Sequence, residues 1–149
     1  MHIGEICTNS TVYCTRDDSV QDAAAKMRQY HVGDVVVIDM PDNDKFPVGI
    51  ITDRDIVVSV IALGLDPASL LVGDIMSDDL DTCSTSDDVY ETIERMRLRG
   101  VRRMPVVDEN GRLAGVVSAD DLLGFLAEEM GELARIAPHQ LAQEKRARH

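Results

Sequence analysis

The sequence predicts a mixed α+β fold of the α/β class, built from two copies of a small domain. The segment Ile3-Gly4-Glu5-Ile6 reappears as Val72-Gly73-Asp74-Ile75, and Met27-Arg28 reappears as Met96-Arg97. Each copy also reads as a short strand, an amphipathic helix, two apolar strands and a second helix. The period of 66 to 69 residues is too long for a solenoid unit. Because each half alone buries little surface, we expect the copies to pack together.

Each predicted element has its own signal. Ser19 and Asp88 precede apolar residues at helical spacing and resemble the first residues of capping boxes. Short, β-branched and apolar segments indicate strands buried on both faces. The predicted strands are 13–15, 35–38 and 48–51, then 82–84, 104–107 and 113–117. Second helices are expected over 53–63 and from 120 to about Met130, where Gly131 ends the helix. The predicted domains are 1–66 and 67–131, followed by a helical or disordered tail at 132–149.

The two hairpin turns differ between the copies. Asn110-Gly111 is a strong turn signal in the second copy. The longer acidic loop at 40–47 suggests calcium, but it lacks alternating carboxylates and a closing Glu. We therefore favour a solvated turn. For the basic end at 143–149 we favour a frayed terminus over a nucleic-acid arm.

Composition excludes several classes of function. The net charge of −12 disfavours nucleic acid and anionic membrane surfaces as partners, because both are bound through clustered Lys and Arg. No apolar run reaches the length of a membrane span, and no signal peptide is expected, so we predict a cytoplasmic protein. The three cysteines form no CxxC pair, which fits a reducing compartment. For Cys14 and Cys83 we favour buried hydrophobic roles over redox chemistry.

One motif occurs in both copies where a buried strand meets a helix. It reads Gly49-Ile50-Ile51-Thr52-x-x-Asp55 in the first copy and Gly115-Val116-Val117-Ser118-x-x-Asp121 in the second. A hydroxyl and a carboxylate near a helix N-terminus suit a ligand with phosphate and ribose groups. The same spacing is also a capping pattern that stabilises a helix without a ligand. Both interpretations stay open from the sequence.

With these motifs in order, the chain resembles the CBS domain family, and in particular a stand-alone tandem CBS pair (a Bateman module). The resemblance covers Ile3 to about Glu129. It rests on the two motifs above, on Asp74-Ile75-Met76-Ser77 and on the segment from Gly100 to Asp108, which reads Gly-Val-Arg-Arg-Met-Pro-Val-Val-Asp. It implies two βαββα repeats related by a pseudo-twofold axis, with two clefts between them.

The resemblance also implies an adenosine-containing ligand, such as AMP, ADP, ATP or S-adenosylmethionine. We expect no required cofactor and no metal site. Asp55 and Asp121 would then hold ribose hydroxyls, and Thr52 and Ser118 would contact phosphate or ribose. The adenine would lie against Val32, Val35, Val101, Met104 and Pro105. Thr82 matches a position where the family often has a nucleotide-contacting Thr.

The copies depart from each other within this pattern. Val36 stands at the Pro105 position and Tyr13 at the Thr82 position, so we expect unequal clefts. Arg54 is suited to phosphate, whereas its counterpart Asp120 repels it.

The sequence allows more than one role for the other charged residues near the motifs. For Arg102 and Arg103, phosphate contact and a surface salt bridge are both open. We expect Arg95 and Arg99 to face solvent near Glu91 and Glu94. For His31 we favour a role at the helix C-terminus over a ligand contact.

Catalytic machinery is not evident in the sequence. No Ser or Cys has a local His partner, and the four histidines lack metal-site spacing. We therefore expect a non-enzymatic regulatory or sensor module that forms a homodimer. A separate regulated protein is a further possibility, and the sequence does not identify one. The alternative is a ligand-free structural or dimerisation module, in which the motifs serve only as caps.

Overall fold

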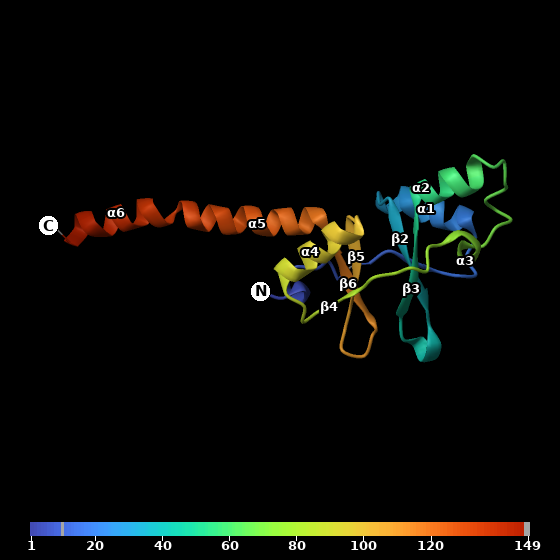
Figure 1. Ribbon diagram of the computed structural model, residues 1–149, viewed down its shortest axis with the longest axis horizontal. Coiled ribbons are helices and arrows are strands. Elements are labelled where there is room, and N and C mark those ends of the chain that lie inside the picture. Colours follow the sequence, from blue (N-terminus) through green and yellow to red (C-terminus); the bar gives the residue numbers. More distant parts are fainter. Residues whose placement is uncertain (10, 148–149) are drawn as a thin grey trace.

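The computed structural model describes residues 1–9 and 11–147 and contains two copies of one small α+β unit (Figure 1). Its two three-stranded sheets and flanking helices confirm the predicted fold class. The first copy consists of β1 (Tyr13–Thr15), α1 (Val20–Tyr30), β2 (Asp34–Asp39), β3 (Phe46–Thr52), α2 (Asp53–Ile56) and a π-helical segment (Val57–Ile61). The second consists of β4 (Cys83–Ser84), α4 (Val89–Arg99), β5 (Arg103–Val107), β6 (Leu113–Ser118) and α5 (Ala119–Ala134). Short helices Ile3–Glu5, Pro41–Asn43 and α3 (Val72–Ile75) lie in the connections, and α6 (Ile136–Ala147) follows α5.

The two sheets have the same topology. In each, the first strand runs parallel to the second, and the second pairs with the third as an antiparallel hairpin. Val36 pairs with Ile50 in the first copy, and Pro105 pairs with Val116 at the equivalent place in the second. The register shifts at equivalent points, after Val37 and after Val106.

Caps define both ends of the first helix in each copy. The Ser19 hydroxyl accepts a hydrogen bond from the Asp22 amide at 3.0 Å, and the Asp88 carboxylate accepts bonds from the amides of Tyr90 and Glu91. At the other end, His31 and Gly100 adopt the left-handed conformation, with φ of 55° and 67°. Gly100 adopts this conformation without strain because it has no Cβ. His31 adopts the same conformation although it has a Cβ.

The segment preceding each copy packs on the other copy. Ile3 lies in the core of the second copy, and its amide donates to the Asp87 carbonyl at 2.9 Å. Val72 lies in the core of the first copy, and its amide donates to the Asp18 carbonyl at 2.8 Å. This exchange of equivalent segments ties the two cores together.

The exchanged segments explain the glycine of each repeated motif. Thr8 forms a β-bridge with Val116, and Ser77 forms one with Ile50. The segment that precedes each copy therefore runs beside the third strand of the other copy. A Cβ at Gly49 would lie 2.7 Å from the Ser77 carbonyl oxygen, and a Cβ at Gly115 would overlap the Thr8 carbonyl oxygen. Only glycine permits this close approach.

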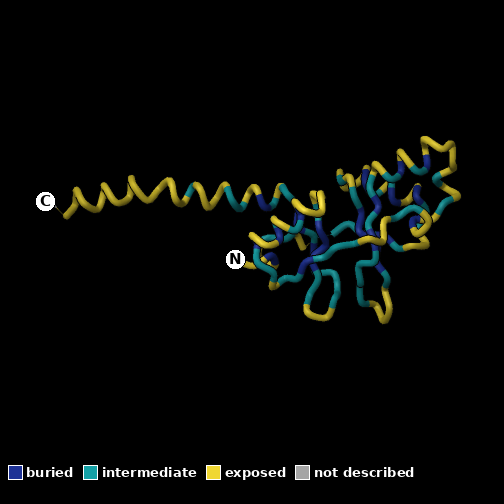
Figure 2. The backbone as a smooth tube through the Cα atoms, viewed as in Figure 1, coloured by how far each residue is buried: buried dark blue, intermediate teal, exposed yellow. Residues whose placement is uncertain are grey.

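The C-terminal helices extend away from the body. Helix α5 continues through Gly131 to Ala134, and α6 continues to Ala147, so the prediction that the helix ends near Met130 was wrong. Gly131 lowers helix propensity but does not by itself end a helix. Figure 2 shows that α6 is exposed along its whole length, whereas α5 includes buried and intermediate residues. Across residues 1–9 and 11–147, no helix has the length and hydropathy that a bilayer crossing requires.

Candidate ligand cleft between the two copies

A cavity of about 320 Å³ lies between the two copies. Its floor consists of two equivalent cross-strand pairs, Val36 with Ile50 and Pro105 with Val116. The cavity therefore sits where the pseudo-symmetric sheets face each other. The remaining lining residues are Thr8, Thr11, Val12, Tyr30, Val32, Asp34 and Arg103.

The strand register decides which predicted wall residues reach this cavity. Val32 and Pro105 line the cavity, whereas Val35 and Met104 do not. Each of these two side chains is 1% exposed and lies in the hydrophobic core of its own copy. Successive side chains on a strand point to opposite faces, so Val36 and Pro105 face the cleft while their neighbours face the core. The assignment of Val35 and Met104 to the adenine wall therefore does not fit the geometry.

A charge pair crosses the cleft at equivalent positions of the two copies. Arg103 stands in the second copy where Asp34 stands in the first, and Arg103 Nε lies 3.3 Å from Asp34 Oδ1. The two side chains are 38% and 22% exposed, and both line the cavity. Burial raises the pKa of the Asp34 carboxyl, Arg103 opposes this rise, and Asp53 adds to it. The salt bridge proposed for Arg103 thus exists, and it places a cation in the cavity wall.

An unpaired hydroxyl also lines the cavity. Thr11 Oγ1 is buried and has no hydrogen-bond partner among residues 1–9 and 11–147. An unsatisfied buried polar atom costs free energy, so such atoms are uncommon unless a ligand or water pairs with them. The sequence did not point to Thr11, because this residue precedes β1 and no regular strand alternation fixes the face of its side chain.

The repeated Thr/Ser-x-x-Asp motifs form reciprocal caps. The Thr52 amide donates to Asp55 Oδ2 at 2.9 Å, and the Asp55 amide donates to Thr52 Oγ1 at 3.1 Å. Ser118 and Asp121 make the same two contacts at 3.0 Å each. The capping interpretation therefore describes these side chains as they stand. None of the four lines the 320 Å³ cavity, although each carboxylate retains a second oxygen with lone pairs.

Asp121 instead borders an acidic hollow beside α5. This hollow of about 600 Å³ is lined by five carboxylates, together with Met1, Ile6, Gly124 and Phe125. The carboxylates belong to Glu5, Asp120, Asp121, Glu128 and Glu129. Such a wall repels phosphate, in agreement with the unequal charges of Arg54 and Asp120.

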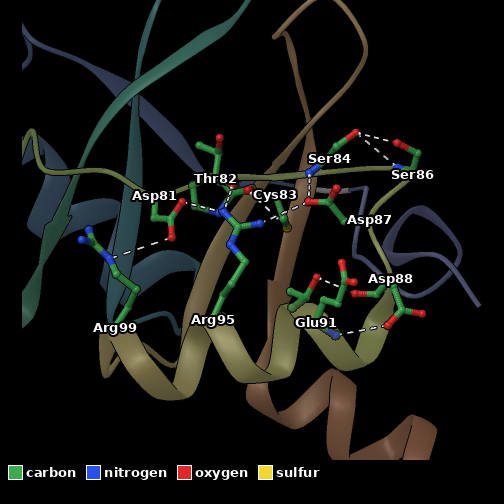
Figure 3. Close-up of polar contacts among 12 residues, drawn as sticks. Asp81, Thr82, Cys83, Ser84, Ser86, Asp87, Asp88, Glu91, Arg95 and Arg99 are labelled. Carbon is green, nitrogen blue, oxygen red and sulfur yellow. Dashed lines mark hydrogen bonds and ion pairs between the residues drawn. The ribbon is translucent and has the colours of Figure 1, made fainter.

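The other predicted site residues lie apart from the cavity. Arg54 is exposed near the start of α2, and Val101 lines an apolar groove between α4 and α5. The Thr82 carbonyl accepts a hydrogen bond from Arg95 at 2.6 Å (Figure 3). Tyr13 borders an adjoining hollow with Lys26, whose ammonium donates to the Tyr13 carbonyl.

Arg99 is exposed, as expected, and Arg95 is half-buried, but neither pairs with Glu91 or Glu94. Figure 3 shows Arg95 pointing toward Asp81 and Asp87, at 2.6 and 3.2 Å, and Arg99 binds Asp79 at 3.3 Å. The sequence did not reveal these pairs because the acids lie in the irregular segments on either side of β4, where no periodicity places their side chains. These arginines secure β4 to α4 and do not reach the cavity.

The buried cysteines are unsuited to redox chemistry. Burial raises the pKa of the Cys14 thiol to about 11 and that of Cys83 to about 12. Thiolate is the reactive form, so both thiols stay protonated and pack as small apolar groups. Among the described residues, no His, Cys, Asp or Glu side chains gather as a metal site requires.

The CBS domain family model matches residues 3–61 and 72–128. The chain belongs to the CBS domain family. It is 35% identical over 121 residues to a protein of Methanopyrus kandleri, a match that covers 81% of this chain and 60% of that protein. It is also 33% identical to YlbB of Bacillus subtilis, with 95% of this chain and 91% of YlbB covered. As a tandem CBS protein, it is similar to a solved CBS domain protein from Pyrobaculum aerophilum complexed with AMP. That likeness has a TM-score of 0.74 and 28% identity, and it covers 86% of this chain and 99% of the other.

Proposed function

We propose that this CBS pair is a non-enzymatic regulatory module that binds an adenosine-containing nucleotide in the cleft between its copies. One observation carries the proposal: the inter-copy cavity combines an apolar floor with the Arg103 cation and the unpaired Thr11 hydroxyl. Binding sites for small molecules typically join an apolar lining to a few placed polar groups, in cavities of about 300–1,000 Å³. The AMP complex of the Pyrobaculum protein supports this class of ligand.

Each part of the cavity matches a part of the nucleotide. Val36, Ile50, Pro105 and Val116 provide an apolar surface for a flat purine ring. The planar guanidinium of Arg103 suits a phosphate group, which then competes with Asp34 for it. The Thr11 hydroxyl gains a partner from the base or the ribose. AMP fits this arrangement because one phosphate requires one nearby cation.

Asp55 and Asp121 do not line this cavity, so as proposed ribose ligands they would hold a nucleoside outside it, through their second carboxylate oxygens. Such a contact leaves the caps intact, because each cap uses only one oxygen. We also propose a homodimer and a separate regulated protein, with ligand binding changing the angle between the copies. We also propose that the protein is cytoplasmic and that it does not catalyse a reaction.

A second candidate is the ligand-free structural module. The reciprocal caps favour it, because both motif carboxylates already have backbone partners. The two candidates differ in their response to nucleotide. A binder unfolds at a higher temperature as AMP is added, whereas a scaffold shows no change with any adenosyl compound.

The decisive experiment is calorimetric titration with AMP of the wild type, Arg103→Gln and the control Arg102→Gln. Arg103→Gln should weaken AMP binding roughly 10- to 150-fold, because a charge-assisted hydrogen bond contributes roughly 1.5–3 kcal/mol. Arg102 is exposed and lies outside the cavity lining, so its replacement should have little effect. Adenosine, AMP and S-adenosylmethionine titrated side by side then define the ligand class. Equal affinities of the two variants for AMP would refute the assignment of Arg103.

A further inference from the structure

A second hollow adjoins the inter-copy cavity beside Tyr13. It has a volume of about 300 Å³ and is lined by Thr11, Val12, Tyr13, Lys26 and Tyr30. Three of these residues, Thr11, Val12 and Tyr30, also line the 320 Å³ cavity. The two spaces therefore share a wall, and a ligand that fills the cavity lies next to the hollow.

Lys26 supplies the charge of this hollow. Its ammonium group donates a hydrogen bond to the Tyr13 carbonyl at 2.6 Å, and it retains two further protons that can be donated. Within residues 1–9 and 11–147, no carboxylate lies within 4.0 Å of this ammonium group. Lys45 adds a second positive charge nearby, because its ammonium group lies 4.4 Å from the centre of the Tyr13 ring. The surroundings of Tyr13 are therefore locally positive in a chain whose net charge is −12.

The second copy has a cation at the same position, but carboxylates neutralise it. Arg95 occupies the place of Lys26 in the repeat, and both side chains donate to the equivalent backbone carbonyl of their own copy. The Arg95 guanidinium also pairs with Asp81 and Asp87, at 2.6 and 3.2 Å (Figure 3). The first copy has Val12 at the position of Asp81. The difference between the copies therefore leaves the charge of Lys26 available to a ligand.

We propose that the hollow beside Tyr13 is a subsite for a second phosphate, held by the Lys26 ammonium group, so that the cleft binds a nucleoside diphosphate more tightly than AMP. This inference rests on the proposed nucleotide site. The first phosphate remains at Arg103, and the second accepts hydrogen bonds from the free protons of Lys26. An ammonium group binds phosphate as a point charge and imposes no fixed geometry on it. The cavity thus selects the nucleotide, and Lys26 selects the number of its phosphates.

The test is calorimetric titration with AMP and with ADP, in buffer without divalent cations, of the wild type, Lys26→Gln, Lys26→Arg and Arg28→Gln. The readout is the ratio of the two dissociation constants within each protein, because a disturbed cleft weakens both ligands alike. The wild type should bind ADP about tenfold more tightly than AMP. Lys26→Gln should bring the ratio to about one, whereas Lys26→Arg should retain most of the preference because it keeps the charge.

Arg28→Gln is the matched control, because Arg28 is an exposed cation of the same helix that lines neither space. It makes the same change of net charge and should leave the ratio as in the wild type. Equal affinities of the wild type for AMP and ADP would overturn the subsite and leave the AMP site standing. An unchanged ratio in Lys26→Gln, or an equal loss of preference in Arg28→Gln, would do the same. Binding of neither nucleotide would overturn the subsite together with the proposed function.

Discussion

The two copies share one backbone plan but differ in charge where they face each other. Asp34 and Arg103 occupy equivalent positions and meet across the cleft at 3.3 Å. Two identical residues there would repel each other if charged. The difference between the copies thus makes this contact complementary, and among the described residues that line the cavity Arg103 is the single cation. The shared fold therefore determines where the cavity lies, and the residues that differ between the copies determine the charge of its wall.

The acidic hollow beside α5 is a second place where the two copies differ in charge. Asp120 stands in the second copy at the position of Arg54 in the first, and it joins four other carboxylates around the hollow beside α5. We therefore expect anionic ligands to avoid this hollow and to favour the cavity that contains Arg103.

The largest expected effect on stability comes from substitutions that disturb the packing of the exchanged segments against the third strands. Gly115→Ala should destabilise the fold by roughly 3 kcal/mol, because the new methyl group overlaps the Thr8 backbone. Gly49→Ala should cost less, because its Cβ has slightly more room beside Ser77. Urea unfolding measures both.

Gly124→Ala is the matched control for these variants. A Cβ there meets nothing within 4 Å, and Gly124 lies within α5. It should stabilise the fold by about 0.5–1 kcal/mol through helix propensity. A Gly115→Ala protein as stable as the wild type would contradict the close packing of the exchanged segments.

The sequence predicts the structure well where the signal is local and periodic. Duplication, strand alternation and caps located all six strands to within two residues and both hairpins. It could not show that Ile3 and Val72 cross to the opposite copy, because a local pattern does not specify which sheet a segment joins. It also placed Val35 in the cleft one residue away from Val36, since an all-apolar strand carries no alternation to fix its face.

A smaller effect is expected at Thr11, whose hydroxyl has no equivalent in the second copy, where Leu80 stands at this position. Thr11→Val should raise the free energy of unfolding by about 1 kcal/mol without ligand, because it removes an unsatisfied buried hydroxyl. The same variant should respond less to AMP. Thermal unfolding with and without AMP measures both changes. If the variant is destabilised and its AMP response is unchanged, Thr11 is not a ligand contact.

The smallest effect concerns the pH dependence of the charge pair. Burial raises the pKa of Asp34 in the folded state, so the folded protein binds this proton more tightly than the unfolded chain does. The stabilising contribution is present below the usual Asp pKa and is lost as pH rises through the raised value. Asp34→Asn should remove this slope.

Unfolding free energies of the wild type and Asp34→Asn, measured from pH 4 to pH 7, provide the test. The wild type should lose stability relative to the variant as pH rises. A difference that stays constant across this range would show that Asp34 titrates normally.

The most direct test of the inter-copy cleft is methyl NMR during titration with AMP. Val36, Ile50 and Val116 line the cavity, whereas Val35 and Val117 lie in the cores and serve as internal controls. The proposed site predicts saturable shifts that are largest for the three cleft methyl groups. No saturable shift at millimolar AMP, or shifts centred on Ile6 beside the acidic hollow, would contradict it.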